Sequence, residues 1–81
     1  MDDQPTTLWK LERDRMAVSC LVRLVPYGIE VDIVHDGVVV LTRAFETDQE
    51  AMNWADRKRA ARLAEGWQLA AVPEADPRTV T

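Results

Sequence analysis

The sequence contains one cysteine, Cys20, and one histidine, His35, among its 81 residues. A lone cysteine excludes a disulfide within the chain, and one cysteine with one histidine excludes a zinc site built from these two residue types in a single chain. No apolar run approaches the roughly 20 residues of a membrane-spanning helix, and the opening MDDQPTTLW has neither the basic nor the apolar region of a signal peptide. We therefore expect a cytoplasmic protein that uses no cofactor and does not contact a membrane.

The net charge and the size of the chain further restrict which partners and which sources of stability are expected. The 14 acidic and 10 basic residues give a net charge of −4, which disfavours general affinity for nucleic acid. A chain of 81 residues forms one domain, and a domain this small buries only about 60% of its unfolded surface. Small domains gain stability from disulfides, metals or self-association. Because this chain has neither an internal disulfide nor such a zinc site, self-association is the remaining source of extra stability, and we expect a homodimer.

The spacing of apolar residues predicts an α+β fold, in which a four-stranded antiparallel β-meander is followed by one C-terminal α-helix packed on the sheet. Turn sequences separate the expected strands, which are residues 7–13, 16–25, 29–35 and 38–45. One face of the second strand is uniformly apolar and is assigned to the core: Met16, Val18, Cys20, Val22 and Leu24. The domain is expected over residues 6–71, between a flexible N-terminus (1–5) and a disordered tail (72–81).

The predicted helix has clear signals at both ends. Thr47 is followed three residues later by Glu50, which is the capping-box pattern, and Gly66 suits the position just after a helix C-terminus. These signals predict a helix over residues 48–65. We expect Trp54 to be its main anchor in the core.

The hairpin around Asp36-Gly37 admits two registers. A two-residue type I′ turn would pair His35 with Val38 and leave Leu41 and Phe45 on the outer face. A three-residue loop over residues 35–37, with Gly37 in a G1 bulge, shifts the pairing by one. The second register is favoured because it buries the larger side chains, which are Val39, Leu41 and Phe45.

Three short motifs carry a resemblance to known proteins. They are Asp36-Gly37 at the turn, Arg43-Ala44-Phe45 before the helix cap, and Asn53-Trp54-Ala55 near the helix start. In these motifs, over roughly residues 18–66, the chain resembles small uncharacterised bacterial proteins, and this likeness implies a fold but no activity. In the order of its elements it also resembles the β4-α units of coactivator, Whirly and Pur-type single-strand DNA binders.

Several residues could carry chemistry, but each has a simpler structural explanation. Glu30 and Asp32 share one strand face and could act as an acid–base pair, yet a solvated face with Arg23 or Arg43 as cross-strand partner is favoured. His35 stands at a hairpin tip and is expected to be an exposed turn residue. Cys20 is expected to be a buried, inert thiol.

Arg57, Lys58, Arg59 and Arg62 form the strongest charged feature of the chain. Their functional interpretation is contact with phosphates or with an acidic protein, and the simpler one is a solvated helix end whose cations complement the helix dipole. Trp67 follows the helix and is a further candidate for a partner contact. These five residues are the candidate contacts for a partner or for nucleic acid.

No catalytic, metal-binding or cofactor-binding residue is assigned. Our leading hypothesis is a non-catalytic macromolecular-interaction module that self-associates, with an unidentified protein partner. The alternative is a nucleic-acid-binding or regulatory protein that uses the basic segment of the helix. An enzyme has the least support, since it would need a site composed of Glu30, Asp32 and His35 from two chains.

Overall fold

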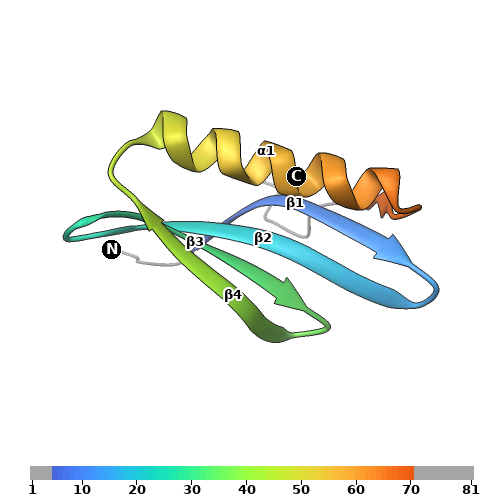
Figure 1. Ribbon diagram of the computed structural model, residues 1–81. Helices are drawn as coiled ribbons and strands as arrows, with labels where there is room; N and C mark the ends of the chain where they lie inside the picture. Colours follow the sequence, from blue (N-terminus) through green and yellow to red (C-terminus); the bar gives the residue numbers. More distant parts are fainter. Residues whose placement is uncertain (1–4, 71–81) are drawn as a thin grey trace, which may run out of the picture.

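The computed structural model describes residues 5–70 of the chain. A twisted antiparallel sheet forms one layer and a single helix forms the other (Figure 1). The elements are β1 (Thr6–Arg13), β2 (Met16–Val25), β3 (Gly28–His35), β4 (Val38–Phe45), α1 (Asp48–Ala64) and the short β5 (Gln68–Leu69). The predicted meander and its packed helix are confirmed, with β5 as an addition. Most of the expected N-terminal segment and the expected tail lie outside the described residues.

The strand order is β4-β3-β2-β1-β5, so β2, β3 and β4 each pair with the strand that precedes them in the sequence. Two tight turns help to fix this order. Asp14 and Arg15 connect β1 to β2, and Asp36 and Gly37 connect β3 to β4, all with positive φ, which is the geometry that matches the twist of a hairpin. The Asp36 turn is also tied to β2, because the Asp36 carboxylate accepts a hydrogen bond from the amide of Ala17 at 2.9 Å.

The register of the β3–β4 hairpin combines features of both predicted alternatives. His35 pairs with Val38 across a two-residue turn, so the favoured three-residue loop is wrong. The pairing then shifts, because Val34 faces Val39 whereas Ile33 faces Leu41, which leaves Val40 as an extra residue in a β-bulge. The bulge brings Leu41 and Phe45 to the face of Ile33, as the favoured register required. Val39 instead lies with Val34 on the opposite face, which corrects its predicted place in the core.

Local capping signals fix both ends of the helix. The Thr47 hydroxyl accepts a hydrogen bond from the amide of Glu50 at 3.2 Å, as the capping-box pattern predicts. At the other end the amide of Trp67 donates to the carbonyl of Arg62 and the amide of Gly66 donates to that of Leu63. These two bonds form a Schellman motif, which turns the chain back toward the sheet.

The core lies between the inner face of the sheet and the helix. Its buried residues are Trp9, Leu11, Val18, Cys20, Ile29, Val31, Ile33, Ala51, Trp54, Ala55 and Trp67. Two alanines let the helix backbone approach the sheet, and the indole Nε1–H of Trp9 donates to the carbonyl of Ala55 at 3.1 Å. Trp54 is a buried anchor, as expected. Leu24 is not in the core: it is 81% exposed, because it lies near the end of β2, where the helix does not cover the sheet.

The residues after the helix complete the sheet on the β1 side. Trp67 is buried against the helix and the sheet, and the short β5 then pairs Leu69 with Leu11 and Gln68 with Glu12. The amide of Ala70 donates to the carbonyl of Lys10 at 2.9 Å. Within residues 5–70, α1 is too short and too polar to cross a membrane.

Candidate functional site

The helix and β4 separate from each other along their length. The chain passes from β4 to α1 through residues 46 and 47 alone, so the two elements are close at this corner and diverge from it (Figure 1). The helix then runs toward the β1–β2 turn and leaves the first half of β4 uncovered. As a result, side chains on the inner face of β4 are exposed beside the helix.

The space between the two elements contains two hollows. The hollow nearer the corner, which we name the mixed hollow, has a volume of about 490 Å³ and is lined by Arg43, Ala44, Phe45, Glu46, Glu50, Asn53 and Arg57. The second, which we name the basic pocket, has a volume of about 250 Å³ and is lined by Trp9, Ile33, Val40, Leu41, Lys58 and Arg62. The mixed hollow contains charges of both signs, whereas the lining of the basic pocket carries only positive charge.

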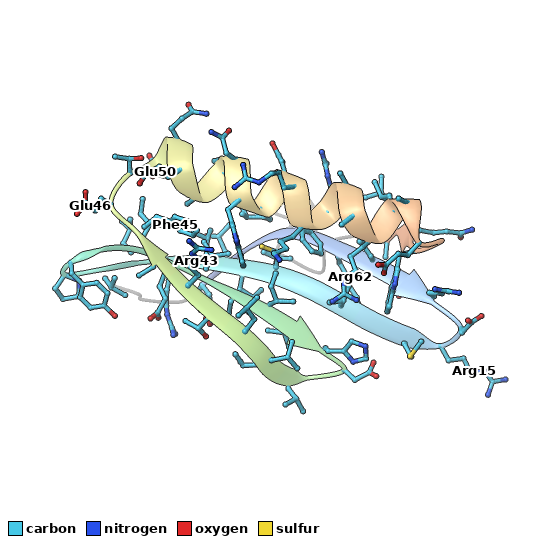
Figure 2. The ribbon with its side chains drawn as sticks, in the orientation of Figure 1. Arg15, Arg43, Phe45, Glu46, Glu50 and Arg62 are labelled. Atoms are coloured by element: carbon cyan, nitrogen blue, oxygen red, sulfur yellow. The ribbon has the colours of Figure 1, made fainter. Side chains whose placement is uncertain are left out.

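The two hollows are lined by four cations, and three of these lie over aromatic rings. The Arg62 guanidinium is 5.4 Å from the centre of the Trp67 ring, the Lys58 ammonium is 5.2 Å from Trp54, and the Arg43 guanidinium is 5.5 Å from Phe45. Figure 2 shows Arg43 and Phe45 beneath the start of the helix and Arg62 beneath its second half. Among the described residues none of the ion pairs includes Arg43, Arg57, Lys58 or Arg62.

Cation–π contacts hold these side chains in place without neutralising their charge. An aromatic ring attracts a cation through its quadrupole, at about 0.5–2 kcal/mol, but it carries no net negative charge. The pocket therefore presents two held positive charges above an aliphatic floor. Such an arrangement suits a ligand that is both anionic and partly apolar.

The structure separates the predicted basic cluster into three parts. Arg57 lines the mixed hollow, and Lys58 and Arg62 line the basic pocket. Arg59 lines neither hollow, and its guanidinium lies 3.8 Å from the carboxylate of Asp56. Trp67 is only 6% exposed, so its ring supports Arg62 from below and offers no open face of its own.

Sequence reasoning missed the strand side of the site. The sequence pattern suggests Arg43 as a cross-strand partner for acidic residues on the outer face, but the register pairs it with Val31 on the inner face. Val40 and Leu41 both line the basic pocket, because the bulge turns two consecutive residues toward the same side. The unbroken aliphatic run of residues 38–41 was the available signal, since few strands need four apolar residues in succession unless both faces are contacted.

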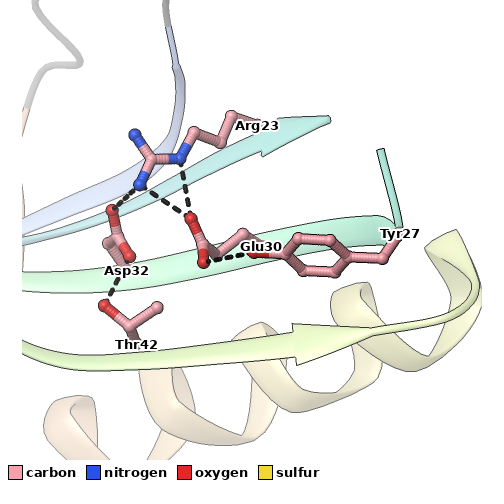
Figure 3. Close-up of polar contacts among 5 residues, drawn as sticks. All are labelled: Arg23, Tyr27, Glu30, Asp32 and Thr42. Carbon is pink, nitrogen blue, oxygen red and sulfur yellow. Dashed lines mark hydrogen bonds and ion pairs between the residues drawn. The ribbon is translucent and has the colours of Figure 1, made fainter. Parts of the chain in front are cut away.

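The carboxylates of Glu30 and Asp32 belong to a polar network on the outer face (Figure 3). Arg23 donates to Glu30 through Nε at 2.9 Å and through Nη2 at 2.7 Å, and its Nη2 is 3.6 Å from Asp32. The hydroxyl of Thr42 donates to Asp32 at 2.7 Å, and that of Tyr27 donates to Glu30 at 3.3 Å. The hydrogen bond from Arg23 to Glu30 and the charges of both carboxylates raise the pKa of Arg23. This network explains both carboxylates as structural partners of Arg23.

The remaining candidates do not join that network. His35 lies on the inner face, where its ring meets Trp67 edge-on with centroids 6.0 Å apart and its Nδ1 is 3.4 Å from the Asp36 carboxylate. Cys20 is fully buried, and burial, with a smaller effect of the Asp32 charge, raises the pKa of its thiol to about 12. The thiol is therefore protonated at neutral pH, and the thiolate that acts as a nucleophile is absent.

Over residues 5–70 no three side chains of histidine, cysteine, aspartate or glutamate come together in a group that could hold an ion. The basic pocket and the mixed hollow are hollows of the described structure that a ligand can enter.

Comparison with known proteins assigns no family to this fold and site. No protein-family model matches the chain, and neither the curated proteins nor the solved structures include a significant match.

Proposed function

We propose that this protein is a non-catalytic macromolecular-interaction module that self-associates through the free edge of β4. The observation that carries the proposal is the exposure of this edge. Val38, Val39, Val40 and Leu41 are 62%, 53%, 56% and 42% exposed, and β4 is the outermost strand on its side of the sheet. Four consecutive exposed aliphatic residues on an edge strand favour a second surface that covers them.

The composition of β4 favours pairing with a strand of another molecule over protection of the edge against such pairing. Edge strands of monomeric proteins are usually blunted by lysine, proline or inward-pointing charges. The eight residues of β4, VVVLTRAF, contain no lysine and no proline, and their one charge, at Arg43 on the inner face, lies outside the exposed aliphatic run of residues 38–41. The bulge at Val40 disturbs the ladder locally, but it leaves residues on both sides of it in extended conformation.

An antiparallel pairing of β4 with the same strand of a second copy gives a two-fold symmetric dimer. Such an interface is isologous, because β4 of one copy pairs with β4 of the other copy. The two sheets join into one, and both helices lie on the same face of it. The aliphatic residues of the two copies then cover one another near the two-fold axis.

The interface is small, which predicts a weak dimer. The exposed fractions of the four aliphatic residues add up to about two whole side chains per copy. At about 1.5–3 kcal/mol for each buried side chain, two copies gain about 6–12 kcal/mol. Association costs about 4–15 kcal/mol in lost freedom of motion, so the margin is narrow. We expect dissociation within the micromolar range of protein concentration.

Sedimentation velocity over a range of about 5–500 µM tests this proposal. The wild type is expected to change from monomer to dimer within that range. Val39→Lys places a charge on the outer side of the edge, away from both hollows, and is expected to remain monomeric. Leu24→Lys is the matched control, because it changes an exposed aliphatic residue of an interior strand to the same charge, and it should dimerise like the wild type. A wild type that stays monomeric throughout would overturn the proposal.

Nucleic-acid binding through Arg57, Lys58 and Arg62 has less support. Single-strand binders stack bases on exposed aromatic rings, and the three tryptophans here are at most 6% exposed. The net charge of −4 also repels a polyanion.

A further inference from the structure

We infer that the basic pocket binds an acidic segment of a partner protein, which places an aliphatic side chain on the pocket floor and carboxylates beside Lys58 and Arg62. The inference rests on the proposed function as an interaction module, and Val40 and Leu41 belong both to the pocket and to the self-associating edge. The pocket opens on the inner face between helix and strand, whereas the edge of β4 lies in the plane of the sheet.

The floor of the pocket supplies the apolar half of this recognition. Trp9 and Ile33 form its buried base, and Val40 and Leu41 rise from β4 with about half of their surface exposed. An aliphatic side chain entering a space of about 250 Å³ would cover these surfaces. Without the bulge, Val40 would pair with Ile33 and Leu41 would point to the other face, so the floor would lose one of its two exposed members.

The rim supplies the charged half. Lys58 and Arg62 stand one helical turn apart, so their side chains project on the same side of α1. Each is held over a tryptophan ring rather than by a carboxylate. The pocket lining contains no acidic residue, although the chain as a whole is acidic. A partner carboxylate would therefore contact two oriented donors, Lys58 and Arg62, whose positive charge no acidic residue of the pocket lining neutralises.

These features favour an acidic peptide over a nucleic acid. A phosphate backbone would engage the same cations, but its bases need exposed rings, and Lys58 and Arg62 cover the faces of Trp54 and Trp67. An aliphatic floor provides no stacking surface, whereas it fits leucine, isoleucine or valine side chains. The partner chemistry that matches both halves of the pocket is an extended or helical segment in which aliphatic residues alternate with glutamate or aspartate.

A ¹⁵N-HSQC titration tests the inference with a defined probe. The probe is a synthetic peptide of about ten residues in which leucine and glutamate alternate with serine. We expect shifts at the indole Nε1–H signals of Trp54 and Trp67 and at the amides of residues 58–62. Two further probes are compared with it: the same peptide with every glutamate replaced by glutamine, and a thymidine oligonucleotide of equal charge.

Two arginine variants separate a specific site from general attraction. Arg62→Gln is expected to weaken binding of the acidic peptide by about tenfold, as the loss of a charge-assisted contact predicts. Arg15→Gln removes the same charge from the distant β1–β2 turn (Figure 2) and should change the affinity by less than about twofold. The glutamine peptide is expected to bind at least about tenfold more weakly than the acidic one.

Each other outcome contradicts the inference. Absence of shifts around the pocket, or equal losses in the Arg62 and Arg15 variants, would show that no specific site exists there. Tighter binding of the oligonucleotide would assign the pocket to nucleic acid instead. Repeating the titration with Val39→Lys keeps the two proposals apart, because both expect this variant to be a monomer that binds the peptide. A wild type that binds the peptide but stays monomeric refutes only the edge, and a wild type that dimerises without binding the peptide refutes only the pocket.

Discussion

The substitution Gly28→Ala should destabilise the protein far more than a comparable change at Gly37. Both glycines have a positive φ, +145° at Gly28 and +87° at Gly37, which side chains disfavour. They differ in their surroundings. A methyl group at Gly28 would overlap with the carbonyl oxygen of Phe45 and lie 3.3 Å from its carbonyl carbon, whereas one at Gly37 would have no atom within 4 Å.

The magnitude follows from these two contributions. A disfavoured backbone conformation costs about 1–3 kcal/mol, and forcing apart the main chain at Phe45 adds about 1–3 kcal/mol by analogy with overpacked cores. Reduced freedom of the unfolded chain offsets about 0.4–1 kcal/mol in both variants. We therefore expect a loss of about 3 kcal/mol for Gly28→Ala and about 1 kcal/mol for Gly37→Ala. A domain of this size has roughly 4–12 kcal/mol in total.

Urea denaturation monitored by tryptophan fluorescence measures both losses. With a slope of about 1 kcal/mol per molar urea, the midpoints should fall by about 3 M and about 1 M. The Val39→Lys background removes any contribution of dimerisation to the midpoint, since association shifts apparent stability with concentration. Equal shifts in the two variants would refute the reasoning, because they would mean that the main chain at Phe45 yields freely to a methyl group. The same peptide titration, repeated with Gly28→Ala, should show whether this corner, which borders the mixed hollow, affects peptide binding in the basic pocket.

Two further predictions concern Cys20 and Thr47. Because the pKa of the Cys20 thiol is raised from 9.0 to about 12 in the folded state, its contribution to stability is fully present below pH 9 and is lost as pH rises from there to about 12. Urea midpoints of the wild type should decline over this window more than those of Cys20→Ala, and an identical decline would exclude the thiol as the cause. Thr47→Ala removes the acceptor for the Glu50 amide and is expected to lower the free energy of unfolding by about 1 kcal/mol. Thr47→Ser, which keeps the hydroxyl, serves as its control, and a loss of similar size in the serine variant would argue against the cap.

The sequence was most informative where structure depends on near neighbours. Alternating apolar residues placed the four strands, and Thr47 and Gly66 placed the ends of the helix within a residue. The bulge at Val40 was not predictable in the same way. It stands in a run of similar aliphatic residues, with no glycine to signal the extra residue, and its position is fixed by the pairing of the neighbouring strand.

The site was only partly predictable, for a related reason. Residues Arg57, Lys58 and Arg62 were recognised as a cluster from their spacing, but their division between two hollows depends on the angle at which α1 crosses the sheet. Trp9, Trp54 and Ala55 pack together between the helix and the sheet. Leu24 is exposed, although the predicted alternation correctly placed it on the same face as Val22.

The short strand β5 has a consequence for how far association can proceed. A sheet with two open edges can add copies on both sides without limit, and this is a common route to fibres. In this fold the residues after the helix return to the side of the sheet opposite β4 and occupy part of the β1 edge, where Leu69 pairs with Leu11. A two-residue strand is too short to template another chain. With one edge available and the other partly occupied, growth that starts at β4 would end with a closed pair instead of a polymer.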